Sequence, residues 1–210
     1  MSDRSTQIST SLASITREFQ VRGWAIGTSG NFSAVVDREP LHVAISPSGI
    51  DKGALMAEQI LMIDQQVRVI SGHAARPSDE SPLHIKIIQE RGVGAVLHTH
   101  SIWNTILSDL YADDEGLAIE GYEMLKGLEG ISTHAHREWV PILENSQDMS
   151  VLAARVGVTL RKHEAAHAFL IRQHGLYSWG ENLAQAKRHV EIIEFLLEVM
   201  GRTLIIKSRK

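Results

Sequence analysis

Two histidines one residue apart follow an apolar segment near the middle of the chain. His98 and His100 flank Thr99 directly after residues 94–97, which read Gly-Ala-Val-Leu. Alternate side chains of a β-strand point to the same face, so we expect both imidazoles to face one point while Thr99 faces away. This geometry suits two ligands of one metal ion.

A third histidine follows a second β-rich run. Residues 168–171 are apolar, and His174 comes shortly after them, in Gln173-His174-Gly175. Three imidazoles would bind zinc and leave a fourth position for water or substrate, as in a catalytic site. The chain has no cysteine, so any metal must use nitrogen and oxygen ligands. Iron, cobalt or manganese would also suit such a site, and ordinary strand histidines are the alternative.

Another histidine motif lies at residues 163–167, which read His-Glu-Ala-Ala-His. In zinc proteases this pattern places two ligands on one helical face. Here it falls where a predicted helix ends and a β-rich run begins, and Leu170 and Gln173 replace the glycine and histidine of the extended signature. We therefore expect a solvated helix-to-strand connection, and we expect His167→Ala to have almost no effect.

The bulk composition is that of a globular protein. With 210 residues, 43% apolar and 22% charged, the chain is expected to form a single domain over residues 1–210. A net charge of −4 and scattered basic residues give no field that would attract nucleic acid. No segment has the apolar length of a membrane span, and the first residues do not resemble a leader peptide, so we expect a cytoplasmic protein with no membrane partner.

Hydrophobic periodicity predicts the elements that must position the histidines. Helices are expected from about residue 8 to 22 and over 81–91, 101–109, 148–161 and 183–200. Strands are expected over 41–46, 60–64 and the run before His98, with short segments at 117–119 and 139–143 and a hairpin over 168–179. This order indicates an α/β fold with a mixed or antiparallel central sheet flanked by helices.

Two polar loops and two glutamates are further candidates for phosphate binding and for catalysis. Residues 27–33 and 46–49 are rich in glycine and hydroxyl side chains, which suits an anionic phosphate, although ordinary turns have the same composition. Glu80 lies at a predicted helix start, where capping is a sufficient explanation. Glu123 lies in a segment of unclear structure, where a surface position is the simplest interpretation. Composition alone assigns neither glutamate a catalytic role.

Five motifs, taken in order, resemble those of the class II aldolase/adducin family, zinc enzymes that act on sugar phosphates. The resemblance covers nearly the whole chain, and the motifs lie at residues 27–33, 46–49, 77–80, 98–100 and 173–175. It implies a three-layer α/β/α sandwich with a mostly antiparallel central sheet. It also implies one Zn²⁺ per subunit and a homotetramer with its sites near subunit boundaries.

The resemblance also implies roles for individual residues. His98, His100 and His174 would bind the metal, and Glu123 would be the catalytic acid/base. Glu80 stands where the family's aldolases carry a catalytic glutamate, so it would be either a second acid/base or a carboxylate beside the zinc. The substrate phosphate would be bound by Thr28, Ser29, Gly30, Asn31, Ser48, Gly49 and Ser78.

Three segments indicate which reaction of the family to expect. Residues 123–127, 140–145 and 172–180 look most like those of the family's dehydratases, which implies removal of water from a sugar phosphate. A sugar-phosphate aldolase or pentulose-phosphate epimerase would use the same zinc and phosphate sites. A non-catalytic interaction module is a further alternative, but such a module has no need of an open site with three histidines.

Overall fold

A large sheet organises the fold. The computed structural model describes residues 3–72 and 75–209, and in them nine strands pair in the order β4-β3-β2-β1-β5-β9-β8-β7-β6. Neighbouring strands are antiparallel except β7 and β8, which are parallel. The strands are β1 (Asn31–Arg38), β2 (Leu41–Ile45), β3 (Leu61–Asp64), β4 (Val69–Ser71), β5 (Ala95–Thr99), β6 (Gly116–Glu120), β7 (Arg137–Leu143), β8 (Ala168–Ile171) and β9 (Gly175–Gly180).

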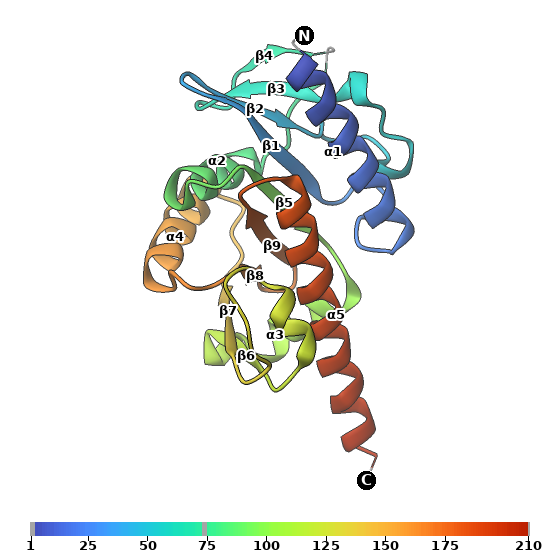
Figure 1. Cartoon of the computed structure of the whole chain (residues 1–210), viewed down its shortest axis with the longest axis vertical. Helices are drawn as coiled ribbons and strands as arrows, with labels where there is room; N and C mark the ends of the chain where they lie inside the picture. The colour runs from blue at the N-terminus through green and yellow to red at the C-terminus, as the bar shows by residue number, and fades with distance from the viewer. Residues whose placement is uncertain (1–2, 73–74, 210) are drawn as a thin grey trace.

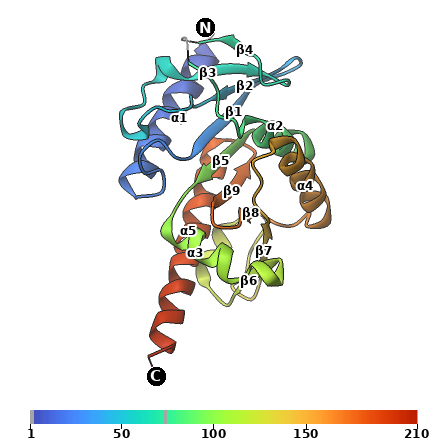
Figure 2. The same ribbon diagram turned by 180° about the vertical axis from the view of Figure 1, so that it is seen from behind.

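Helices cover both faces of the sheet and complete three layers (Figures 1 and 2). Helices α1 (Asp3–Val21), α3 (Ile102–Leu110) and α5 (Leu183–Lys207) lie on one face, and α2 (Ser81–Arg91) and α4 (Met149–Lys162) pack together on the other. Short 3₁₀ helices connect the strands: η1 (Lys52–Ala54), η2 (Ala57–Gln59), η3 (Ala112–Asp114) and η4 (Glu123–Gly127). The three-layer α/β/α prediction with a mostly antiparallel sheet is confirmed.

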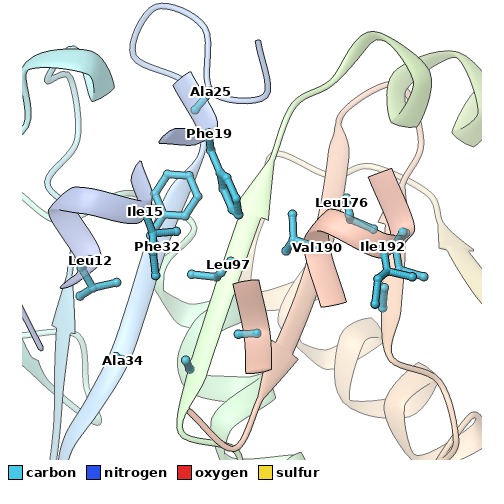
Figure 3. Packing of buried hydrophobic residues seen from close by; sticks show 14 of the residues in the cluster. Leu12, Ile15, Phe19, Ala25, Phe32, Ala34, Leu97, Leu176, Val190 and Ile192 are labelled. Atoms are coloured by element: carbon cyan, nitrogen blue, oxygen red, sulfur yellow. The ribbon is translucent and has the colours of Figure 1, made fainter. Parts of the chain in front are cut away.

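Two buried apolar clusters hold the layers together. In the cluster under α1 and α5, Phe19 packs edge-on against Phe32 at 5.8 Å between ring centroids, and Leu97 of β5 faces Val190 of α5 (Figure 3). Burying each such side chain stabilises the fold by about 1.5–3 kcal/mol. Val96 points to the opposite cluster under α2 and α4, and His98 lies on that same face of β5. The alternation predicted for β5 therefore holds.

Polar side chains set several helix ends. Ser101 accepts a hydrogen bond from the N–H of Asn104 at the start of α3, and Asp148 and Asn182 cap α4 and α5 in the same way. Among the described residues, no helix has both the length and the apolar composition that a membrane span requires.

Some predicted boundaries differ from the structure: the helix expected over 183–200 continues to Lys207, and one loop is shorter than expected. The loop expected over residues 27–33 ends early, because β1 begins at Asn31, which lies opposite His98 of β5. Asn31 and Ser33 are polar residues that resemble loop residues in sequence, yet both are buried. Asn31 is hydrogen-bonded to Glu80 and Ser33 to buried His84, which satisfies both polar side chains within the strand.

Candidate metal centre and phosphate pocket

The three histidines of the sequence analysis lie together at one end of the central strands. His98 is in β5, His100 follows that strand, and His174 lies in the turn between β8 and β9. Thr99 of β5 is opposite Leu176 of β9, which brings this turn to the strand end. One ring nitrogen from each histidine lies within 4.8 Å of the others. This spacing suits a metal ion bound by three histidines.

Burial and hydrogen bonding leave ring lone pairs facing inward. Nδ1 of His98 donates to the carbonyl oxygen of Leu176 at 2.9 Å, so its Nε2 carries a lone pair and faces Nε2 of His100 at 2.8 Å. Burial lowers the pKa of His98 well below its ordinary value and that of His100 to about 4, so both rings are neutral at pH 7. Two neutral rings this close need a proton or a cation between them. The donor set therefore fits a divalent metal such as zinc.

Gly175 allows the turn to approach the metal centre. A Cβ at this position would lie 2.4 Å from the carbonyl oxygen of Thr99 and 2.7 Å from Cε1 of His98. Gln173, on the other side of His174, has a positive φ of 52°, and its N–H donates to the hydroxyl of Ser108 at 3.0 Å. The glycine and this anchored turn together place His174 against β5.

A buried glutamate holds the opposite face of the histidine motif. The hydroxyl of Thr99 donates to Oε1 of Glu194 in α5 at 2.5 Å. Nδ2 of Asn104 donates to the same oxygen at 3.0 Å and to the carbonyl of Thr99 at 3.2 Å. Glu194 is 2% exposed, and burial raises its pKa. It thus connects α5 to the strand end between the two histidines, a role that the sequence analysis missed.

Glu80 directs its carboxylate into the histidine cluster instead of capping its helix. It precedes α2, but its side chain accepts no capping hydrogen bond, so the capping interpretation is wrong. Its carboxylate lies 3.0 Å from Nε2 of His174 and 3.6 Å from Nε2 of His98, and it accepts a hydrogen bond from Nδ2 of Asn31 at 2.6 Å. Burial raises the pKa of Glu80, but these three residues outweigh burial and hold the pKa well below its usual range.

The three segments with the proposed phosphate ligands converge beside this carboxylate. Nδ2 of Asn31 donates to Oγ of Ser78 at 3.2 Å, and the N–H of Ser48 donates to the carbonyl of Arg76 at 3.0 Å. Gly30 has a positive φ of 73°, and a Cβ there would lie 2.8 Å from the carbonyl oxygen of His98. The loops that carry Thr28, Ser29, Gly30, Asn31, Ser48, Gly49 and Ser78 are therefore neighbours of the histidine strand.

A buried lysine joins two of these loops. Nζ of Lys52 donates to the carbonyl oxygens of Thr28 at 3.0 Å, Ile50 at 3.2 Å and Pro47 at 3.4 Å, and Lys52 is 1% exposed. Burial lowers its pKa, while Asp51 opposes that shift. The sequence offered no signal for this lysine, because its partners are main-chain carbonyls.

Glu123 lies elsewhere in the chain. It begins η4, its side chain is 71% exposed, and it contacts Nζ of Lys126 at 2.7 Å and Nδ1 of His134 at 3.7 Å. Within the described part of the chain, neither of these ionic partners belongs to the histidine cluster. A single chain thus assembles the histidines and Glu80 but does not pair Glu123 with them.

The protease-like motif is not a metal site. Helix α4 ends at Lys162, directly before His163, and β8 begins at Ala168, so the helical spacing that the motif needs is absent, as expected. The expectation of a solvated connection is wrong for His167, however. Its Nδ1 lies 3.1 Å from the carboxylate of Glu138, which is 1% exposed, and its Nε2 donates to the carbonyl of Glu129 at 2.9 Å. His167 therefore neutralises a buried carboxylate, and its removal is not expected to be silent.

Curated relatives match most of the chain. A methylthioribulose-1-phosphate dehydratase of Xanthomonas campestris pv. campestris (strain 8004) is 44% identical over 193 residues, which is 91% of this chain and 87% of that protein. A protein of the same name from Xylella fastidiosa (strain 9a5c) is 42% identical over 181 residues, covering 86% of this chain and 81% of the relative.

Solved structures share the fold, and a family model matches the sequence. An L-fuculose 1-phosphate aldolase superposes with a TM-score of 0.78 at 23% identity, covering 98% of this chain and 89% of that one. YgbL from Klebsiella pneumoniae, described as a putative aldolase/epimerase/decarboxylase, superposes with a TM-score of 0.79 at 23% identity. The match covers 94% of this chain and 90% of that one. The model of the Class II Aldolase and Adducin N-terminal domain matches residues 10–200. The chain therefore belongs to the class II aldolase and adducin family.

Proposed function

We propose that this chain is a hydro-lyase that removes water from 5-methylthioribulose 1-phosphate and forms 2,3-diketo-5-methylthiopentyl 1-phosphate. The observation that carries this proposal is the 44% identity to a protein named for this activity over 91% of the chain. The cluster of His98, His100, His174 and Glu80 supports it, because the reaction needs a site that stabilises enolate charge. The proposal places the reaction in methionine salvage, in the cytoplasm, with residues 1–210 acting as one domain.

The three histidines would hold one Zn²⁺ per subunit. A divalent metal bound there supplies a Lewis acid that stabilises negative charge on the substrate's carbonyl oxygen. His98 is the most constrained of the three, since Leu176 fixes its tautomer and Tyr177 stacks on its ring at 3.9 Å between centroids. Such outer contacts hold a ligand in one orientation and strengthen metal binding.

The converging loops would bind the substrate phosphate. Thr28, Ser29, Gly30, Asn31, Ser48, Gly49 and Ser78 form the proposed phosphate pocket, and Lys52 fixes two of its loops from behind. A phosphate held here, away from the reacting carbons, keeps the ketone in register with the histidine cluster.

Proton transfer is assigned to Glu123. This carboxylate would take the proton from the carbon next to the ketone, and the hydroxyl on the following carbon would leave as water after receiving a proton. The resulting enol rearranges to the diketone, so the net change is loss of one water. Glu80 is assigned to the carboxylate position beside the metal, because it contacts His98 and His174 and its side chain is only 16% exposed.

Because Glu123 has its ionic contacts outside the cluster, we assign it to the site of a neighbouring copy in a homotetramer. Exposed apolar side chains support association: Ile102, Ile106 and Leu110 on α3 and Ile205 and Ile206 near the end of α5, which projects beyond the sheet (Figure 1). Mixed tetramers of His98→Ala and Glu123→Gln chains should regain activity, up to about a quarter of the sites by random pairing. Two inactive chains that stay inactive when mixed would contradict the shared site.

The deciding assay incubates the zinc-loaded protein with 5-methylthioribulose 1-phosphate and follows the absorbance of the diketone. Formation of the diketone supports dehydration. An aldolase would instead release dihydroxyacetone phosphate and an aldehyde from a deoxyketose phosphate, and an epimerase would interconvert pentulose phosphates. A non-catalytic interaction module would bind no stoichiometric metal, which metal analysis of the purified protein tests directly.

A further inference from the structure

A buried histidine outside the metal cluster connects the proposed phosphate pocket to Glu80. His84 lies in the first turns of α2, is fully buried, and packs edge-on against Tyr177 at 5.8 Å between ring centroids. Its Nε2 is hydrogen-bonded to Oδ1 of Asn31, and its Nδ1 lies 2.7 Å from the hydroxyl of Ser33. No pattern in the sequence points to a role for this residue.

The chemistry of these partners fixes the proton positions on His84. A carbonyl oxygen can only accept, so Nε2 of His84 must donate to Oδ1 of Asn31. Burial also keeps the ring neutral by lowering its pKa to about 4, so Nδ1 is an acceptor. The Ser33 hydroxyl then donates to Nδ1 at 2.7 Å in preference to the carbonyl of Val96, which is 3.4 Å away.

The N–H at Nε2 of His84 determines which way the Asn31 amide faces. With Oδ1 bound to His84, both protons of Nδ2 point outward, to Oε2 of Glu80 at 2.6 Å and to Oγ of Ser78 at 3.2 Å. A reversed amide would place its oxygen against the carboxylate of Glu80, where two acceptors repel. The reversed amide would also turn its NH₂ toward the Nε2–H of His84, where two donors repel, so His84 and Glu80 together exclude that orientation.

The orientation of the Asn31 amide also determines whether the Ser78 hydroxyl donates or accepts. Oγ of Ser78 accepts from Nδ2 of Asn31 and from the N–H of Glu80, both at 3.2 Å, which occupies its two lone pairs. Its own proton remains available for an acceptor in the pocket. The Ser78 hydroxyl can therefore donate its proton to an anion. If the Asn31 amide were reversed, its oxygen would accept that proton, and a lone pair of the Ser78 hydroxyl would face the anion.

We propose that His84 is a positioning residue that fixes the Asn31 amide, makes Ser78 a hydrogen-bond donor to a bound phosphate group, and holds the Glu80 carboxylate against His174 and His98. Only the identification of the anion as the substrate's phosphate rests on the proposed function. The hydrogen-bond polarity itself rests on His84, Asn31, Ser78 and Glu80.

The test compares two substitutions at His84 with a matched control. His84→Gln keeps one N–H that can donate to Asn31, whereas His84→Leu keeps the apolar volume and removes the donor. His189 is the control, because it is 3% exposed, bonds Trp179 and Glu129 through its two ring nitrogens, and lies at the opposite end of β9. His189→Leu therefore removes a buried histidine without touching Asn31.

The main measurement is calorimetric binding of inorganic phosphate to each zinc-loaded protein. His84→Leu should weaken phosphate binding by about tenfold or more, since one donor becomes a repelling acceptor. His84→Gln should stay within about threefold of the parent chain, and His189→Leu should match the parent. Equal phosphate affinity in His84→Leu and the parent would overturn the proposal, as would an equal loss in His189→Leu.

A second measurement needs neither activity nor a variant. Nitrogen-15 spectra of the histidine rings in the parent chain should show His84 as the neutral tautomer with its proton on Nε2. A proton on Nδ1, or a charged ring at pH 7, would refute the orientation of Asn31 even if His84→Leu fails to fold. Dehydratase activity that is absent while both measurements succeed would count against the proposed function alone.

Discussion

The carboxylate of Glu80 contacts two of the three clustered histidines at once, at 3.0 Å from Nε2 of His174 and 3.6 Å from Nε2 of His98. We predict that Glu80→Gln, which removes the charge at nearly constant shape, lowers zinc affinity by about 10- to 100-fold. Competition with a chromogenic chelator measures this. Asp79→Asn is the control, since Asp79 is exposed and pairs only loosely with Arg76 at 3.8 Å. Equal affinities in the two variants would remove Glu80 from the metal centre.

His98→Ala should reduce bound zinc from one per chain to nearly none and should abolish turnover. The reason is that a two-histidine remnant lacks the third nitrogen, and the contact between His98 and Leu176 that orients the site is lost as well. Metal analysis after dialysis measures the content. His42→Ala, at a partly exposed histidine beside Asp37, should retain full zinc content. Stoichiometric zinc in His98→Ala would exclude this metal site.

Glu123→Gln should keep its zinc and lose turnover by at least about 100-fold, because the amide cannot accept the substrate proton. Steady-state assays and metal analysis of the same sample separate the two effects. Glu120→Gln offers a matched control on a nearby exposed carboxylate that faces Arg137 at 3.8 Å. Near-normal turnover of Glu123→Gln would leave the reaction without its assigned base.

Glu194→Leu should weaken zinc binding by about tenfold and lower the free energy of unfolding by about 2 kcal/mol, because Thr99 and Asn104 lose their shared buried acceptor. Glu194→Gln keeps an acceptor oxygen of the same shape and should have a much smaller effect on both quantities. Chelator competition and denaturant unfolding provide the data. Leucine and glutamine variants with the same zinc affinity would show that the contact does not position the histidine strand.

The ion pair of His167 and Glu138 should make stability depend on pH. Burial lowers the pKa of His167, but Glu138 outweighs it and raises the pKa. Protonated His167 therefore contributes fully to the stability of the fold below about pH 6.5. This contribution is lost as the pH rises through the raised pKa of His167. Burial raises the pKa of Glu138, but His167 and His136 outweigh it and lower the pKa, so the contribution of Glu138 is lost at pH values below about 4.3.

The pair is consequently strongest between these two limits. His167→Gln should lower the melting temperature more at pH 5.5 than at pH 8.5, and His136 and Arg91 are the neighbouring ionisable side chains. Thermal unfolding at the two pH values measures the difference, with His42→Gln as the control. A reduction that is equal at both pH values would contradict the charged pair.

Local patterns in the sequence were sufficient to predict which three histidines cluster. The alternation in β5 placed His98 and His100 on one side of Thr99, and the β-rich run before His174 placed that residue at the start of a turn. The helix over 81–91 was predicted with the bounds observed for α2. These features depend on neighbours in the chain, so periodicity and turn residues reveal them.

Residues whose partners are distant in sequence could not be predicted in this way. Lys52, His84 and Glu194 have their roles because main-chain carbonyls or polar side chains of other elements surround them. Glu80 shows the same limit, since a helix start is an equally good local environment for a capping carboxylate and for one that turns into a cluster. The local pattern around Glu123 likewise gave no sign that its contacts would be Lys126 and His134.

The three clustered histidines come from separate parts of the chain, and this has a consequence for the lifetime of the protein. An ion bound to both His98 and His174 would cross-link a central strand to a turn far along a chain that has no cysteine for disulfides. Because the ion would bind only the folded state, it would shift the folding equilibrium toward that state. Zinc supply would then control how much of this enzyme survives proteolysis in a metal-starved cell, in addition to how fast each molecule works.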